Sequence, residues 1–252
     1  MNSPVNVNFS MNDFLEHGHS DPITLISPEA MAKIRPAIEA LLCREPAGDF
    51  YSRDPGAHGR LIRNRHLDCP ELLALATHAS LLKCVTAILG QDLLIWRVQL
   101  FNKEPGGREI PWHQDAGFWP LNPTIAVSAW IAIDETTVDN SCVQVISGSH
   151  RSHKPHVQST REMALLRMVE TSHIDFSRKV DMELRPGQCF LFTERVLHHS
   201  EPNRSTKRRM GVSVRFIPTS VQVRRYDGAD HGTVLVHGKD QHLLNRMAIP
   251  KR

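Results

Sequence analysis

Three side chains have the types and spacing of a metal site: His113 and Asp115, separated by Gln114, and His198 far downstream. Two imidazoles and one carboxylate can occupy one face of an iron(II) ion and leave the opposite face open for oxygen chemistry. On a strand, residues i and i+2 point to the same side, so His113 and Asp115 can reach one ion while Gln114 faces away, or bends round if the strand has ended. Because the chain holds 15 His, such a pattern can also arise by chance.

The elements that precede His113 favour the metal interpretation. Residues 95–101 are predicted to form a strand of mixed alternation. Pro105-Gly106-Gly107 then marks a turn, and residues 110–112 lead directly into His113.

A second pair of predicted strands surrounds His198. Residues 188–192 are a short apolar run behind a Pro-Gly turn, which indicates a buried strand leading to His198. Residues 210–217 alternate between apolar and polar side chains and indicate another strand. The two strands flank a polar loop, so we expect a hairpin-like unit with His198 and Arg209 near its inner ends, facing one cavity.

Arg209 offers an anchor for a carboxylate. An iron oxygenase of this type needs two electrons beyond those that its substrate gives, and a 2-oxo acid can supply them by decarboxylation while it chelates the metal. Its far carboxylate suits the two-pronged geometry of a guanidinium, and the Ser200 hydroxyl could add a hydrogen bond. The alternative is a solvated basic turn, which we favour for Arg204 and Lys207.

Four motifs in order resemble the phytanoyl-CoA dioxygenase family. Residues 198–203 with Arg209 resemble its distal motif, His-x-Ser-x-x-Asn followed by Arg, and residues 111–115 resemble its proximal motif. Residues 129–132, 139–140 and 146–150 resemble its middle signatures. The similar stretch runs from about Gln99 to Phe216. This resemblance implies a mainly β protein with flanking helices, a double-stranded β-helix of the jelly-roll, cupin-like type, that uses Fe(II), 2-oxoglutarate and O₂.

The resemblance also implies roles for single residues. His113, Asp115 and His198 would be the iron ligands, and Arg209 and Ser200 would hold the distal carboxylate of 2-oxoglutarate. The further positions that line the co-substrate pocket in relatives are Gln99, Asn102, Gln114 and Trp130. The predicted substrate-pocket residues are Phe118, Trp119 and Arg215. Plain core packing remains an equal alternative for Trp130, which lies inside an apolar strand.

Two choices narrow the predicted chemistry. Only one member of the His198-His199 doublet can ligate, because adjacent strand residues point opposite ways, and the spacing to Ser200 and Arg209 favours His198. Related halogenating enzymes lack the carboxylate that Asp115 supplies here. The resemblance therefore implies hydroxylation of an unactivated C–H bond, while desaturation, epoxidation and cyclisation remain open.

Length and pattern predict a single domain over residues 1–252, with a helical buttress at about 27–90, a jelly-roll core at about 93–222 and a tail at 223–252. Ser27 and Pro28 indicate the start of a helix that runs to about Cys43. A second helical stretch runs from Cys69 to near Gly90. Residues 1–20 are predicted to be a flexible lead with at most a short strand.

Several connecting segments carry further predictions. Residues 125–133 are almost continuously apolar, so both faces of this strand should be covered, and Asp134-Glu135 then ends it as a turn rather than as an acid–base pair. Residues 49–64 form a long loop, and residues 161–170 are expected to form a lid helix. The basic loop at 150–156 either faces solvent or contacts an acidic substrate group. The segment 234–240 resembles a closing segment of bacterial relatives and is expected near the mouth of the site.

Composition excludes several classes of protein. With 40% hydrophobic residues, 23% charged residues and a net charge of +3, the chain resembles an ordinary globular enzyme rather than a nucleic-acid-binding or membrane-surface protein. No apolar run reaches transmembrane length, and no signal-peptide pattern is visible. Five scattered Cys indicate free thiols, which predicts a cytoplasmic location. The expected partner is a small organic metabolite, and the expected state is a monomer or homodimer.

Two other classes of function fit parts of the pattern. A cupin-type metal enzyme doing non-oxidative work would share the ligands but consume no oxygen. A catalytically silent binding relative would share the fold, although the intact ligand set argues against it.

Overall fold

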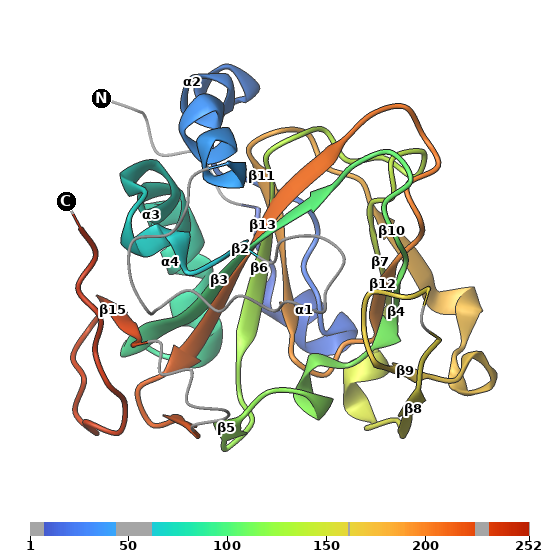
Figure 1. Cartoon of the computed structure of the whole chain (residues 1–252). Helices are drawn as coiled ribbons and strands as arrows, with labels where there is room; N and C mark the ends of the chain where they lie inside the picture. The colour runs from blue at the N-terminus through green and yellow to red at the C-terminus, as the bar shows by residue number, and fades with distance from the viewer. Residues whose placement is uncertain (1–7, 44–61, 161, 225–231, 252) are drawn as a thin grey trace.

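The computed structural model describes residues 8–43, 62–160, 162–224 and 232–251 of the chain, and its centre is a pair of antiparallel sheets that pack face to face (Figure 1). The larger sheet has seven strands, which are, in spatial order, β1 (Ile23–Thr24), β11 (Gln188–Thr193), β6 (Val127–Ala132), β13 (Arg209–Pro218), β3 (Leu93–Lys103) and β15 (Val234–His237), with β2 (Ile62–Arg63) also beside β3. The smaller sheet has four strands, in the order β10 (Lys179–Met182), β7 (Val143–Ile146), β12 (His198–Ser200) and β4 (Ile110–His113). This is the jelly-roll arrangement that the resemblance implied.

Helices cover the outer face of the larger sheet, at the left of Figure 1. The α2 helix (Pro28–Glu39) begins as predicted, because the Ser27 hydroxyl accepts a hydrogen bond from the Ala30 backbone N–H at 3.2 Å. The second predicted helical stretch is interrupted at residues 77–78 and forms α3 (Pro70–Ala76) and α4 (Ala79–Leu89). Among the described residues, no single helix could cross a membrane by its length and apolar character, and only the α3–α4 pair, bent by 47°, passes that test jointly.

Both faces of β6 are buried, as its apolar sequence predicted. Ala129 and Ile131 belong to the core beneath the helices. Trp130 and Ala132 point the other way and pack with side chains of the smaller sheet, including Val145. The space between the sheets is therefore a second core, and polar side chains that point into it must find partners or ligands.

A β-bulge on β3 breaks the alternation of that strand. Arg215 of β13 is opposite Arg97, but the next pair is Phe216 with Ile95, so Trp96 is the extra residue of β3 at the bulge. Ile95 and Val98 both face the helix-covered core. The two residues between them, Trp96 and Arg97, therefore both point to the inner side of the sheet. This explains the mixed alternation of residues 95–101.

The predicted hairpin-like unit around His198 is wrong. In the larger sheet β6 lies between β11 and β13, and β12, which carries His198, belongs to the smaller sheet. Both β11 and β13 form their backbone ladders with β6, one on each edge of that strand, so they do not pair with each other. His198 and Arg209 nevertheless face the same interior, from opposite sheets.

Three segments also differ from their predictions. The expected lid helix is absent from residues 162–170. Turns lead into β9 (Arg167–Val169), which pairs with β8 (His156–Gln158), so the backbone hydrogen bonds are made within a hairpin instead. The N-terminal lead contains α1 (Met11–His17), because Ser10 caps its first turn and Phe14 is buried. Most of the predicted loop at 49–64 lies outside the described residues, and residues 62–63 form β2.

The remaining short elements connect the sheets. Strands β5 (Leu121–Asn122) and β14 (Gln222–Val223) pair with each other, and β15 forms the edge of the larger sheet beside residues 93–95. The single-turn helices are η1 (Ala40–Leu42), η2 (Arg65–Leu67), η3 (Asp115–Gly117), η4 (Ser149–Arg151), η5 (Thr171–His173) and η6 (Phe176–Arg178).

Candidate metal centre

Two neighbouring strands of the smaller sheet bring the histidines together. His113 is the last residue of β4 and pairs across the ladder with His198, the first residue of β12. The chain then leaves the strand, and η3 begins with Asp115, so the carboxylate bends round toward both rings. The Nε2 atoms of His113 and His198 each lie 3.7 Å from a carboxylate oxygen of Asp115, and the three possible ligand atoms lie within 4.8 Å of one another.

The surroundings of the trio suit a divalent metal ion. The Nδ1 atom of His113 donates to the Pro111 carbonyl at 2.7 Å, and that of His198 donates to the Val196 carbonyl at 3.0 Å. These hydrogen bonds fix the tautomer that leaves each Nε2 lone pair free for a metal. Burial lowers the pKa of His198 to about 4, so this imidazole is neutral at neutral pH.

Asp115 completes the donor set as a carboxylate. Burial by itself would raise its pKa, but the adjacent rings of His198 and His113 and the charge of Arg215 together lower the pKa to about 2. An ionised carboxylate with two imidazoles is the donor set of a ferrous site with an open face.

His199 lies on the other side of β12. Its ring stacks on Trp112 with centroids 4.7 Å apart, and its two nitrogens lie 3.1 Å from side-chain oxygens of Gln144 and Glu109. Because consecutive strand residues point opposite ways, His199 is turned away from the trio. The geometry therefore groups His198, and not His199, with His113 and Asp115.

Arg209 is buried with unused hydrogen-bond donors. It is 1% exposed, and its Nε and one terminal nitrogen have no hydrogen-bond partner in the described part of the protein. Its guanidinium lies 5.3 Å from the ring centre of Trp130. Burial lowers the pKa of Arg209 to about 10, which still leaves it charged at neutral pH. A buried cation with free donors fits a carboxylate ligand.

Lys103 was missed by the sequence reasoning. It pairs with Arg209 across the β3–β13 ladder, and its Nζ donates to the Ser200 hydroxyl oxygen at 2.7 Å. Burial and the charge of Arg209 lower the pKa of Lys103 to about 6. Because Lys103 occupies a lone pair of the Ser200 oxygen, the hydroxyl proton remains available for an acceptor beside Arg209. The signal that could have found Lys103 is its even spacing from Arg97 and Gln99 on one face of β3.

Two predicted co-substrate residues have other duties. Asn102 is exposed on β3 and donates to Glu104 at 2.9 Å, because it points away from the inner face that holds Lys103. The buried Gln114 amide donates to the carbonyls of Ser152 and Arg195 and accepts from the Lys154 backbone N–H. Its hydrogen bonds hold these loops around the trio.

The other predicted residues lie on the inner side. Gln99 accepts a hydrogen bond from Arg215 at 3.3 Å, and Trp119 lies 4.9 Å from the Arg215 guanidinium. Phe118 is 38% exposed and meets the His113 ring edge-on, so it lies at the rim of the site. Of the basic loop, His156 turns inward, accepts from the Gln114 backbone N–H at 3.0 Å and contacts Phe118.

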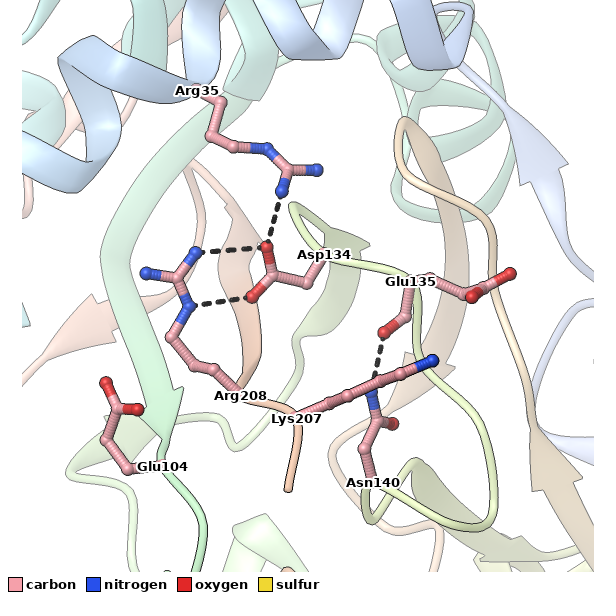
Figure 2. A pocket seen from close by; sticks show the side chains of 7 residues that line it. All are labelled: Arg35, Glu104, Asp134, Glu135, Asn140, Lys207 and Arg208. Atoms are coloured by element: carbon pink, nitrogen blue, oxygen red, sulfur yellow. Dashed lines mark hydrogen bonds and ion pairs between the residues drawn. The ribbon is translucent and has the colours of Figure 1, made fainter. Parts of the chain in front are cut away.

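A separate hollow of about 500 Å³ lies at the far end of β6 (Figure 2). Three of its charged side chains pair with one another, since Asp134 binds Arg35 and Arg208, each at 2.9 Å. Asp134 also accepts from the Met210 backbone N–H at 2.9 Å. This carboxylate ties the end of β6 to α2 and β13, which agrees with its predicted structural role as a strand end.

The chain is similar to known oxygenases in sequence and in structure. The profile of the family described as "Phytanoyl-CoA dioxygenase (PhyH)" matches residues 15–211. The "Dioxygenase lolE1" of Epichloe uncinata is 27% identical over 167 residues, which cover 65% of this chain and 61% of that protein. The peroxisomal phytanoyl-CoA dioxygenase of Homo sapiens is 27% identical over 154 residues, which cover 58% of this chain and 46% of that protein.

These alignments therefore span about half the length of the curated relatives. Among solved structures, "CytC3 with Fe(II) and alpha-ketoglutarate" superposes with a TM-score of 0.73 at 26% identity, covering 97% of this chain and 94% of that chain. The whole described architecture, and not only the motif segments, is thus shared with an enzyme solved with iron and the keto acid.

Proposed function

Because the chain belongs to the phytanoyl-CoA dioxygenase family, we propose that it is an Fe(II)- and 2-oxoglutarate-dependent oxygenase that hydroxylates an unactivated C–H bond of a small organic molecule and releases succinate and CO₂. The observation that carries the proposal is the convergence of His113, Asp115 and His198 within 4.8 Å, in an interior that also holds the unsatisfied guanidinium of Arg209. A metal site alone would fit many enzymes, and the buried cation adds the requirement for an acidic co-substrate.

The residues around the metal trio would divide this function between metal binding and co-substrate binding. Nε2 of His113, Nε2 of His198 and the carboxylate of Asp115 would hold iron, and the carbonyls of Pro111 and Val196 keep the two imidazoles in the binding tautomer. Iron and 2-oxoglutarate, when bound, supply the chemistry that activates O₂. Arg209 and the Ser200 hydroxyl would bind the distal carboxylate of 2-oxoglutarate, and Trp130 walls off solvent beside it.

Asp115 favours hydroxylation among the reactions open to this family. A carboxylate on the metal leaves no vacant position for a halide, so halogenation is not expected. Desaturation, epoxidation and cyclisation would use the same residues and differ only in how the substrate lies, and product analysis must distinguish them.

Oxygen uptake tests the proposal directly. The protein is supplied with Fe(II), ascorbate and 2-oxoglutarate and is screened against a metabolite library for substrate-stimulated succinate release, with products identified by mass spectrometry. Uptake of oxygen that depends on 2-oxoglutarate and is lost in His198→Ala supports the proposal. Formation of products without oxygen uptake would instead assign a non-oxidative metal enzyme.

The same proteins are titrated with Fe(II) and 2-oxoglutarate without oxygen, and the absorption band of the iron–keto acid complex is recorded. This measurement needs no substrate. If no such complex forms in the unmodified protein, the proposed function is overturned whatever the library contains.

A further inference from the structure

Two arginines face each other on the inner side of the larger sheet, apart from Arg209. Arg97 and Arg215 are direct partners across the β3–β13 ladder, so their Cα atoms are about 5 Å apart by the usual geometry of such pairs. The bulge at Trp96 turns Arg97 inward, toward the same interior as Arg215. Such close like charges are costly unless an anion binds between them.

Both guanidinium groups stack on aromatic rings, which leaves N–H groups at their edges able to bind a ligand. Arg97 lies over the Trp96 ring at 4.6 Å and makes no hydrogen bond or ion pair with any described residue. Arg215 lies over Trp119 at 4.9 Å and, within the described ranges, donates one long hydrogen bond, to Gln99 at 3.3 Å. Stacking occupies the face of a guanidinium, while its N–H groups point outward in the plane, where they can bind an oxyanion in two-pronged fashion.

Charges among the described residues do not balance this pair. Asp115 is the carboxylate whose field reaches both Arg97 and Arg215. With ferrous iron bound, Asp115 would balance one of its two charges and a carboxylate of 2-oxoglutarate would balance the other. The distal carboxylate neutralises Arg209. No further carboxylate of the described residues then balances Arg97 and Arg215, which lie in a buried region.

We propose that Arg97 and Arg215 form an anion-binding subsite for the substrate, which receives a carboxylate or phosphonate group. The proposal rests on the proposed function, because it assigns Arg209 to the co-substrate and this pair to the molecule that is oxidised. Trp96 and Trp119 meet edge to face, with ring centres 5.2 Å apart, and form an aromatic wall beside the pair. The substrate is thus an acid that carries its anionic group on the Arg215 side of the metal trio and presents a C–H bond to the trio.

Anionic probes test the subsite without knowledge of the substrate. The protein is loaded with Fe(II) and 2-oxoglutarate without oxygen, and benzoate, phenylphosphonate and the neutral benzamide are titrated by calorimetry. At least one anion should bind tenfold or more tightly than benzamide, and the tighter anion identifies the preferred group. Equal binding of benzamide and both anions would overturn the proposal.

Matched variants assign the binding to the arginine pair. Arg97→Gln and Arg215→Gln should each weaken binding of the preferred anion at least tenfold and leave the affinity for 2-oxoglutarate unchanged. Arg185→Gln, which removes an exposed arginine outside the site, is the control and should bind as the unmodified protein does. Arg215→Lys keeps the charge at the more buried position, and a partial loss is expected because the two-pronged contact is gone.

Two results contradict the assignment. Anion binding that is unchanged in both glutamine variants would remove the arginine pair from any such site. Loss of 2-oxoglutarate affinity with unchanged anion binding would place the pair in the co-substrate site.

The proposed function can fail separately. If the iron–keto acid absorption band does not form in the unmodified protein, the same titrations are repeated on metal-free protein, because neither arginine is a metal ligand. Anion binding that still depends on Arg97 and Arg215 then supports the subsite alone, and its absence overturns the subsite as well.

Discussion

His198 and His199 are adjacent residues that occupy chemically different surroundings. The His198 ring faces the Asp115 carboxylate, with one nitrogen fixed by a backbone carbonyl. The His199 ring is stacked on Trp112 and lies within hydrogen-bond distance of Glu109. The direction of each side chain on β12 therefore decides which imidazole can ligate a metal.

Removing either imidazole should have different consequences. His198→Ala should abolish Fe(II) binding at micromolar concentrations and iron-dependent turnover, because two ligands remain. His199→Ala should retain metal binding and substantial activity while losing about 2–4 kcal/mol of stability through its buried contacts. Anaerobic metal titration and chemical unfolding measure the two effects, and the reverse pattern would reassign the ligand.

Arg209 should govern the affinity for 2-oxoglutarate. Arg209→Gln removes the charge that would hold the distal carboxylate, and we expect KM for 2-oxoglutarate to rise at least a hundredfold, since losing a buried charge-assisted contact costs about 3 kcal/mol or more. Arg208→Gln is the neighbouring control, because Arg208 binds Asp134 and Glu39 at the other side of the sheet. An unchanged requirement for 2-oxoglutarate in Arg209→Gln would refute the anchor role.

The pairing of β13 with β6 leaves little space between Gly211 and the side chain of Trp130. Gly211 of β13 lies against the Trp130 indole, and an added Cβ would come within 2.2 Å of that ring. The same strand carries Arg209 two residues earlier and Arg215 four residues later, on the same face. A change at Gly211 therefore reaches the co-substrate pocket through the position of one rigid ring.

Gly211→Ala should displace Trp130 and weaken 2-oxoglutarate binding. Overpacking of this kind costs about 1–3 kcal/mol, which predicts a lower melting temperature together with a raised KM for 2-oxoglutarate. The double variant Gly211→Ala/Trp130→Phe provides a smaller ring and should recover part of both losses. Equal damage in the single and double variants would show that the contact with Trp130 is not the cause.

Across the whole molecule, burial suppresses the protonation of many histidines. Among the described residues, desolvation lowers the pKa of six histidines, most strongly at two positions, where the values are about 4 for His198 and about 3 for His199. The other four are His19, His78, His150 and His156. Between about pH 6.5 and 4 the unfolded chain therefore binds more protons at these sites than the folded chain.

The metal-free protein should accordingly lose stability as the pH falls from about 7 toward 4. A histidine with a lowered pKa stabilises the fold above its unfolded value, and this contribution is lost with falling pH, at up to about 1.4 kcal/mol per pH unit for each group. Glu109 and Glu194, whose pKa values burial raises, oppose the trend. Urea unfolding at pH 7.5 and 5.5 measures the slope, and His198→Gln should flatten it; an equal slope in both proteins would contradict the assigned pKa.

The sequence by itself determined the identities of the chemical groups. His113, Asp115, His198 and Arg209 could be chosen because a strand direction, a turn and a motif spacing are local properties of the chain. The start of α2 at Ser27 could also be predicted from neighbouring residues, because the capping hydrogen bond joins residues that are three positions apart.

Only the tertiary structure decided which of these groups meet and which do not. Asn102 and Lys103 are neighbours in the chain, but the pairing of β3 with β13 turns Lys103 inward beside Arg209. Three other features also depend on partners far away in sequence. They are the place of β6 between β11 and β13, the bulge that turns Arg97 toward the interior, and the hydrogen bonds between Gln114 and distant loops. The strand order and register are those of the arrangement that buries the most apolar surface and satisfies the most backbone hydrogen-bonding groups. Both quantities are totals over the whole fold, so no local sequence pattern contains them.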